Sequence, residues 1–187
     1  SGNTAGAWDG ATTNWSTDPT GSIATVGWTN GQSAVFSAGT DGVATKAVTI
    51  AGTVATPSIL LEEVGLVNLT GGSIDITGGS IFNTSVLAGT TGRALTWTSA
   101  ITGTGPLTLA VNGDTSPTGN GSNSFFALTG ANDFTGDVTI TSGIVTANSV
   151  LGNAANKVIL NGGGILDANT NVVFTRNLEI GAAGGVI

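Results

Sequence analysis

Short runs of apolar residues and threonine recur along this chain at intervals close to 20 residues. Successive steps between the runs are 19, 19, 21, 31, 20 and 20 residues. A period of this length, built from strands of three or four residues, predicts a parallel β-solenoid whose coils stack about 4.8 Å apart. The runs are anchored at Val48, Val67, Val86, Leu107, Val138, Val158 and Leu178.

Alternation within each run indicates which side chains enter the core. In Val138-Thr139-Ile140 an outward threonine separates two apolar residues, which we expect to point inward. Glycine pairs such as Gly71-Gly72 lie between runs and supply the backbone conformations that tight corners need. The pattern predicts an all-β chain folded as a right-handed parallel β-helix.

Two segments depart from the repeat. Three of the four tryptophans lie within residues 1–42, which we expect to form an N-terminal cap on coils spanning 43–187. The 31-residue step contains the polar stretch 112–124, which predicts a loop inserted at one corner.

A β-sandwich is the competing fold. It requires strands of five or more residues that recur every 8–12 residues. The dipeptides Asn30-Gly31 and Asp41-Gly42 are typical of its hairpin turns. Few runs are long enough for a sandwich, however, and the spacing favours the solenoid.

The composition excludes several function classes. The chain has no His and no Cys, so it offers no Ser-His-Asp triad, thiol nucleophile, disulfide, or ordinary zinc, haem or iron–sulfur site. A net charge of -7 with only four basic residues argues against nucleic acid and anionic membranes as partners. No run approaches the length of a membrane-spanning helix. We expect no cofactor.

Aromatic residues and one polar loop are the candidate contact residues. The first coil of a solenoid exposes unpaired backbone, which an aromatic segment can cover. The residues predicted to form this cap are Trp8, Trp15, Trp28 and Phe36. Tryptophan can alternatively stack on sugars, and a polar loop can contact a partner. One tryptophan and three residues of the loop 112–124 are therefore candidate partner or glycan contacts. These are Trp28, Asn112, Asp114 and Asn120.

Carboxylates are the remaining candidates for catalysis or calcium binding. Glycoside hydrolases use two carboxylates about 5–10 Å apart. The pairs that could meet this spacing are Asp133 with Asp137, Glu62 with Glu63, and Asp75 with Asp167. None lies in a supporting motif, and the nonapeptide calcium repeat is absent from the sequence. We therefore expect neither an enzyme nor a metal site.

One stretch resembles a known repeat. Residues 128–148 read Leu-Thr-Gly-Ala-Asn-Asp-Phe-Thr-Gly-Asp-Val-Thr-Ile-Thr-Ser-Gly-Ile-Val-Thr-Ala-Asn, and 158–167 read Val-Ile-Leu-Asn-Gly-Gly-Gly-Ile-Leu-Asp. This resembles the autotransporter-associated β-strand repeat, although Gly136-Asp137 stands where that repeat has two glycines. The stretch from Trp8-Asp9-Gly10 to Ala34-Val35-Phe36 is similar to the opening segment of such passengers.

The resemblance implies an N-terminal portion of a longer passenger at a bacterial surface. We expect a non-enzymatic extracellular module: a rigid stalk or an adhesin-like passenger. Its partners would be the rest of that passenger, other copies of itself, surface glycans or host proteins. The alternatives are a filament or matrix subunit that stacks end to end, and a carbohydrate-binding or carbohydrate-active β-helix.

Overall fold

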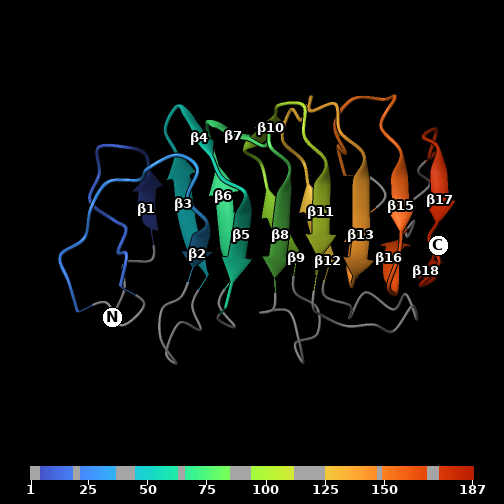
Figure 1. The fold of residues 1–187 in the computed structure, drawn as a ribbon, viewed down its shortest axis with the longest axis horizontal. Coiled ribbons are helices and arrows are strands. Elements are labelled where there is room, and N and C mark those ends of the chain that lie inside the picture. Colours follow the sequence, from blue (N-terminus) through green and yellow to red (C-terminus); the bar gives the residue numbers. More distant parts are fainter. Residues whose placement is uncertain are drawn as a thin grey trace.

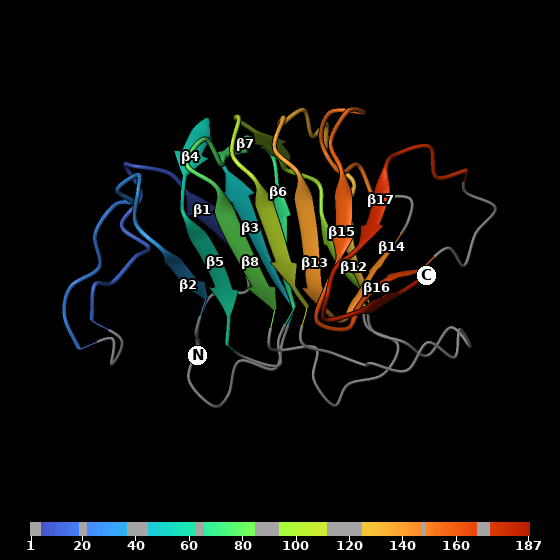
Figure 2. The same ribbon diagram turned by 45° about the vertical axis from the view of Figure 1, so that its right-hand side comes forward.

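A computed structural model describes residues 5–18, 22–36, 45–62, 66–84, 94–111, 125–146, 149–167 and 173–187. In these ranges the regular structure consists of strands, and every pairing between named strands is parallel. Figures 1 and 2 show the strands side by side along the long axis, with the chain advancing from one end to the other. The predicted all-β parallel solenoid is therefore confirmed, and the β-sandwich does not form.

The strands lie on three faces. The first face carries β1 (Ala5–Trp8), β3 (Lys46–Ile50), β6 (Val67–Thr70), β9 (Ala94–Trp97), β12 (Phe125–Leu128), β14 (Ile144–Thr146), β16 (Gly164–Asp167) and β18 (Gly185–Val186). The second carries β4 (Thr53–Ala55), β7 (Ser73–Asp75) and β10 (Ala100–Thr102). The third carries β2 (Ala34–Phe36), β5 (Ser58–Leu61), β8 (Ser80–Thr84), β11 (Leu107–Ala110), β13 (Val138–Ser142), β15 (Val158–Leu160) and β17 (Leu178–Ile180).

Each complete coil visits the faces in turn, as β3, β4 and β5 do. The third face forms one seven-stranded sheet from β2 to β17. On the first face, Thr98 N donates to Leu69 O at 2.9 Å and so links the sheet that ends at β6 to the one that begins at β9. Beyond β10 the second face continues without a named strand, where Asp133 N donates to Ile101 O at 3.0 Å.

The register confirms part of the predicted repeat and corrects the rest. Leu107 pairs with Val138, Val138 with Val158, and Val158 with Leu178, all on the third face. Val48 and Val67, in contrast, lie on the first face. Each coil contributes one run to the first face and one to the third, and both runs have the same alternation. The spacing between runs therefore could not separate the two faces, and the predicted series combined them. Val86 and the whole of 112–124 lie outside the described residues.

The core is a stack of inward side chains that runs the length of the solenoid. Val138 and Ile140 are fully buried, as the alternation predicted, and Thr139 between them is half-buried. The corresponding inward residues of neighbouring third-face strands are Ala34, Ile59, Phe82, Leu109 and Leu160, all buried. Burial of this continuous apolar stack is the main stabilising contribution.

Trp97 fills the middle of the stack, as a core residue. Its ring lies 5.0 Å from that of Phe82 and 4.9 Å from that of Phe126. Its indole Nε1 donates to Val67 O at 2.9 Å, which satisfies the one polar group of a side chain that is 1% exposed.

One buried asparagine ties three consecutive coils together. Ile101 N donates to Asn132 Oδ1 at 2.7 Å, and Asn132 Nδ2 donates to Val150 O at 2.6 Å. The Asn132 side chain is 6% exposed, and its bond to Ile101 N is buried, so it satisfies a backbone donor that has no access to water. This hydrogen bonding takes the place of a regular strand on the second face of that coil.

A single glycine permits the corner between β13 and β14. Gly143 has φ +68, and a Cβ added to it would lie 1.7 Å from Val111 O of the preceding coil. Both the left-handed backbone and the close approach of the next coil require glycine.

We predict that Ile140→Ala lowers the free energy of unfolding by about 2–5 kcal/mol, because it opens a cavity in the core stack. Ile81→Ala is the matched control. Ile81 lies on the same sheet and is 50% exposed, so its truncation should change stability by about 1 kcal/mol or less. Denaturant unfolding measures both, and equal losses would contradict the assignment of the inward face.

Asn132→Ala should destabilise the fold by roughly 1–3 kcal/mol, chiefly because it leaves the buried Ile101 N unpaired. Asn153→Ala is the control, since that side chain accepts a single exposed hydrogen bond from Ala155 N. Hydrogen exchange should show the loss of protection at Ile101 N. Unchanged exchange there would mean that Asn132 does not link the coils.

Candidate functional site

Four aromatic residues form one cluster in the first coil. Trp8 comes from β1 and Phe36 from β2, while Trp15 and Trp28 come from the chain between these strands. The Trp8 ring lies 5.2 Å from that of Trp15, 5.0 Å from that of Trp28 and 5.6 Å from that of Phe36. The structure thus brings together all four residues predicted to form the cap.

The chain that carries this cluster folds back on itself as a hairpin, described over 9–18 and 22–28, which we call the N-terminal hairpin. Trp15 and Val26 exchange backbone hydrogen bonds of 3.0 and 2.6 Å in an antiparallel bridge. The two arms approach each other closely near their base, where a Cβ on Gly27 would lie 2.3 Å from Gly10 O. This close approach requires glycine. Because β1 and β2 are the first strands of two faces, the predicted cap segment 1–42 is continuous with the solenoid.

Asp9 organises the first turn of the N-terminal hairpin. Its Oδ1 accepts hydrogen bonds from Ala11 N at 2.8 Å and Thr12 N at 2.5 Å, and its Oδ2 accepts one from Thr12 Oγ1 at 2.9 Å. The bond from the Thr12 backbone contributes most to lowering the pKa of the Asp9 carboxyl below its ordinary value, and that from Ala11 N follows. The ionised carboxylate is therefore the form that fits this turn.

Two of the four rings leave almost no surface for a ligand, whereas Trp15 and Phe36 are partly exposed. Trp8 is fully buried and Trp28 is 8% exposed. The indole Nε1 of Trp28 donates to Asn30 Oδ1 at 3.0 Å, and that oxygen also accepts from Ala55 N of the next coil. Of the predicted glycan contacts, Trp28 thus serves the packing of the first coils. The other three, Asn112, Asp114 and Asn120, lie outside the described residues.

The structure separates one of the candidate carboxylate pairs, Asp75 and Asp167. Asp75 lies on the second face and accepts from Thr77 N and Thr77 Oγ1 at 2.9 and 2.6 Å, whereas Asp167 lies on the first face. Asp137 Oδ1 accepts from Lys157 N at 2.8 Å, and Asp133 is exposed. Glu63 lies outside the described residues.

Side chains that could bind a metal ion do not form a cluster in the described residues. The described part of the chain contains no group of three or more Asp or Glu side chains that could hold a metal ion. Asp9 Oδ1 accepts hydrogen bonds from its own turn, and Asn14 Nδ2 donates to Ala7 O at 2.8 Å. Nor do the described residues include a helix long and apolar enough to cross a membrane.

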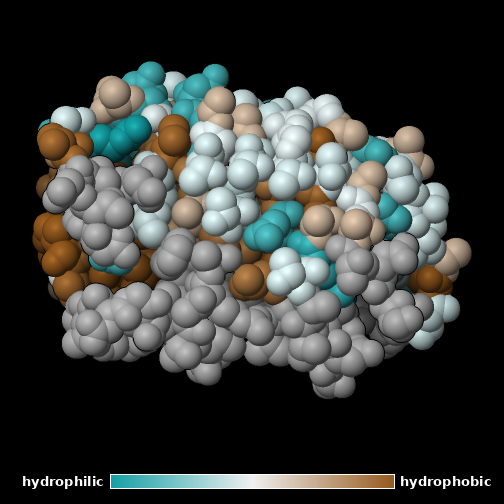
Figure 3. Space-filling model, turned by 180° about the vertical axis from the view of Figure 1, so that it is seen from behind, coloured by the Kyte–Doolittle hydropathy of each residue, from teal (hydrophilic) through white to brown (hydrophobic). Residues whose placement is uncertain are grey.

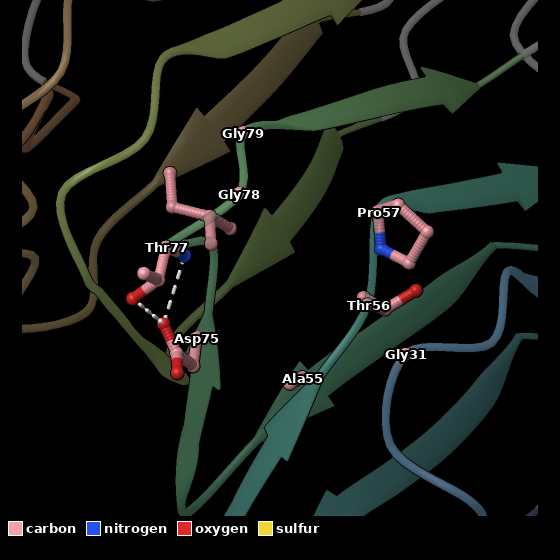
Figure 4. A pocket seen from close by; sticks show the side chains of 9 residues that line it. Gly31, Ala55, Thr56, Pro57, Asp75, Thr77, Gly78 and Gly79 are labelled. Atoms are coloured by element: carbon pink, nitrogen blue, oxygen red, sulfur yellow. Dashed lines mark hydrogen bonds between the residues drawn. The ribbon is translucent and has the colours of Figure 1, made fainter.

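A small open pocket of about 220 Å³ lies at a corner of three consecutive coils. Asp75 and Thr77 lie on one side of it, and Thr56 and Pro57 face them from the other (Figure 4). Thr56 Oγ1 is occupied, at 2.8 Å from Gln32 O and 2.7 Å from Ser58 O. The lining offers one carboxylate, itself bonded to Thr77, and no basic side chain. Sequence reasoning missed this pocket because its residues are adjacent only after the coils stack.

Exposed apolar side chains lie near both ends of the solenoid. Those near the N-terminal end are Ile23, Val26 and Val35, and those at the C-terminal end are brown at the left of Figure 3. The exposed residues there are Val173, Ile180, Val186 and Ile187. Lys157 and Glu179 form an exposed ion pair of 3.1 Å near this end. The described surface thus presents hydroxyls, amides and small apolar groups with few charges.

No family model matches the chain, and no curated protein or solved structure matches it either. The interpretation of the site therefore depends on its geometry and on the sequence resemblance.

We predict that acid loosens the N-terminal hairpin. A lowered pKa means that ionised Asp9 stabilises the fold above the ordinary aspartate pKa of about 3.9, and that this contribution is lost as pH falls through the lower folded value. The NMR signals of the Trp15 and Trp28 indole N–H groups, followed during acid titration, should report the loss. In Asp9→Asn, which cannot titrate, this part of the shift should disappear. An identical titration in both proteins would exclude Asp9 as the cause.

Proposed function

We propose that the chain is a non-enzymatic structural module of a bacterial surface or secreted protein: a rigid β-solenoid stalk or adhesin-like passenger. The observation that carries this proposal is the unbroken third-face sheet, whose seven strands stack in parallel from β2 to β17. A stack of seven strands spans about 30 Å along its axis. One core fills it, so each inner coil is held by its neighbours on both sides.

Three further observations support the proposal. Of the candidate carboxylate pairs, Asp75 and Asp167 lie on different faces, and Asp75 accepts two hydrogen bonds from Thr77. The repeat at 128–148 resembles that of autotransporter passengers and supports an extracellular location. With only 15 charged residues in 187, the chain offers few sites to proteases that cleave at charged residues.

Pulling a single molecule by its two ends tests the proposal. A stalk should unfold at high force and coil by coil, because each coil contacts only its neighbours. A coil of 20 residues, such as the step from Val138 to Val158, should release roughly 65–70 Å of chain. Ile140→Ala should lower the force needed for the coils around β13, and Ile81→Ala should leave it unchanged.

Unfolding of the whole chain in one step at low force would contradict a role as a mechanical stalk. Sedimentation of the purified chain over a wide range of concentrations separates the stalk from a self-assembling filament subunit, which should lengthen as concentration rises. A glycan array separates it from a carbohydrate-binding protein. A hit that Trp28→Ala abolishes, without loss of folding, would replace the stalk proposal.

A further inference from the structure

The first coil leaves two strand edges open. Among the described residues, β1 pairs with β3 alone and β2 with β5 alone. An unpaired edge of a parallel sheet is a template onto which another strand can add. In Figure 1 the N-terminal hairpin lies beyond β1, at this end of the molecule.

The direction of the β1 backbone identifies which groups an added strand would use. Trp8 O accepts from Ala51 N of the second coil at 3.2 Å, so the polar backbone groups of Trp8 face the solenoid. Successive residues of a strand direct these groups to opposite sides. Ala7 therefore faces the open edge, and its carbonyl oxygen is an acceptor for an incoming strand.

Asn14 already occupies that acceptor. Its Nδ2 donates to Ala7 O at 2.8 Å and lies close enough to Gly6 that a Cβ there would be 3.6 Å away. Asn14 is held across the edge because the next residue, Trp15, is bridged to Val26 and packs against the rings of Trp8 and Phe36. The side chain thus takes the position that a strand of another molecule would need.

Two donors in the aromatic cluster lack hydrogen-bond partners, so the cluster is held together by ring packing alone at these positions. The indole Nε1 groups of Trp8 and Trp15 are both buried without a hydrogen-bond partner. Folded proteins seldom leave such donors unpaired, because burial removes the water that would otherwise bind them. The aromatic cluster is therefore a point at which substitution of a few side chains should release the edge.

We propose that the N-terminal hairpin is a plug that prevents a second copy of this chain from adding a strand to β1, and that Asn14 is the blocking residue. A second copy of this chain offers a strand of the same kind, because within the described residues its own β1 pairs on one side only. The residues Ala5, Gly6 and Ala7 of that strand are small and uncharged, so they set no charge against an approaching copy. The inference concerns control of self-association and does not depend on the stalk proposal.

Sedimentation velocity on purified variants tests the plug. Asn14→Ala should raise the average mass above that of the wild type as concentration increases, and Asn14→Ala with Trp15→Ala should raise it further. Adding Ala5→Lys should restore the wild-type mass, because Ala5 is an exposed β1 residue and a charge on an edge strand opposes strand addition. Asn153→Ala, which removes one exposed hydrogen bond away from the edge, should behave as wild type.

The suppressor distinguishes edge blocking from simple destabilisation, since a lysine on β1 would not repair a damaged core. If circular dichroism shows that the variant with both substitutions is unfolded, the test of the plug relies on the Asn14→Ala variant alone. A folded Asn14→Ala variant that keeps the wild-type mass at every concentration would overturn the proposal. So would association that Ala5→Lys does not reduce.

Discussion

Parallel stacking of one coil on the next is the interaction on which this molecule depends. A strand has no partner strand within its own coil, so the inner strands of a face bond to the coil before and the coil after. Pairings such as Val138 with Val158 bring residues 20 positions apart into register and align their side chains in a row. The core, the corners and the outer faces all follow from that register.

Where regular strand pairing stops, other groups replace it. On the second face beyond β10, the amide of Asn132 reaches backbone groups of the coils on either side. In the first coil, Asn30 Oδ1 joins the Trp28 indole to Ala55 N, and Asn14 meets Ala7 O. Asparagine suits these places because one short side chain carries both a donor and an acceptor.

The sequence predicted the architecture because the architecture is periodic. The alternation at Val138-Thr139-Ile140 and the steps from Leu107 to Leu178 were sufficient for the third face. The face of Val48 could not be assigned, because runs on two faces share one alternation. The joining of Trp8, Trp15, Trp28 and Phe36 could be predicted from composition, but the contact of Asn14 with Ala7 could not. That contact depends on the close approach of the two hairpin arms at Gly10 and Gly27, which no periodic signal in the sequence encodes.

The register also bears on how such a chain can change over generations. Duplication or loss of one whole coil, such as the 20 residues from Val138 to Val158, moves every later strand by one rung and leaves each side chain on its original face. Insertion or deletion of one residue within a strand, in contrast, exchanges the inward and outward side chains for the rest of that strand. Lineages of this protein should therefore differ by whole coils and by corner insertions, while the strands between them keep their length.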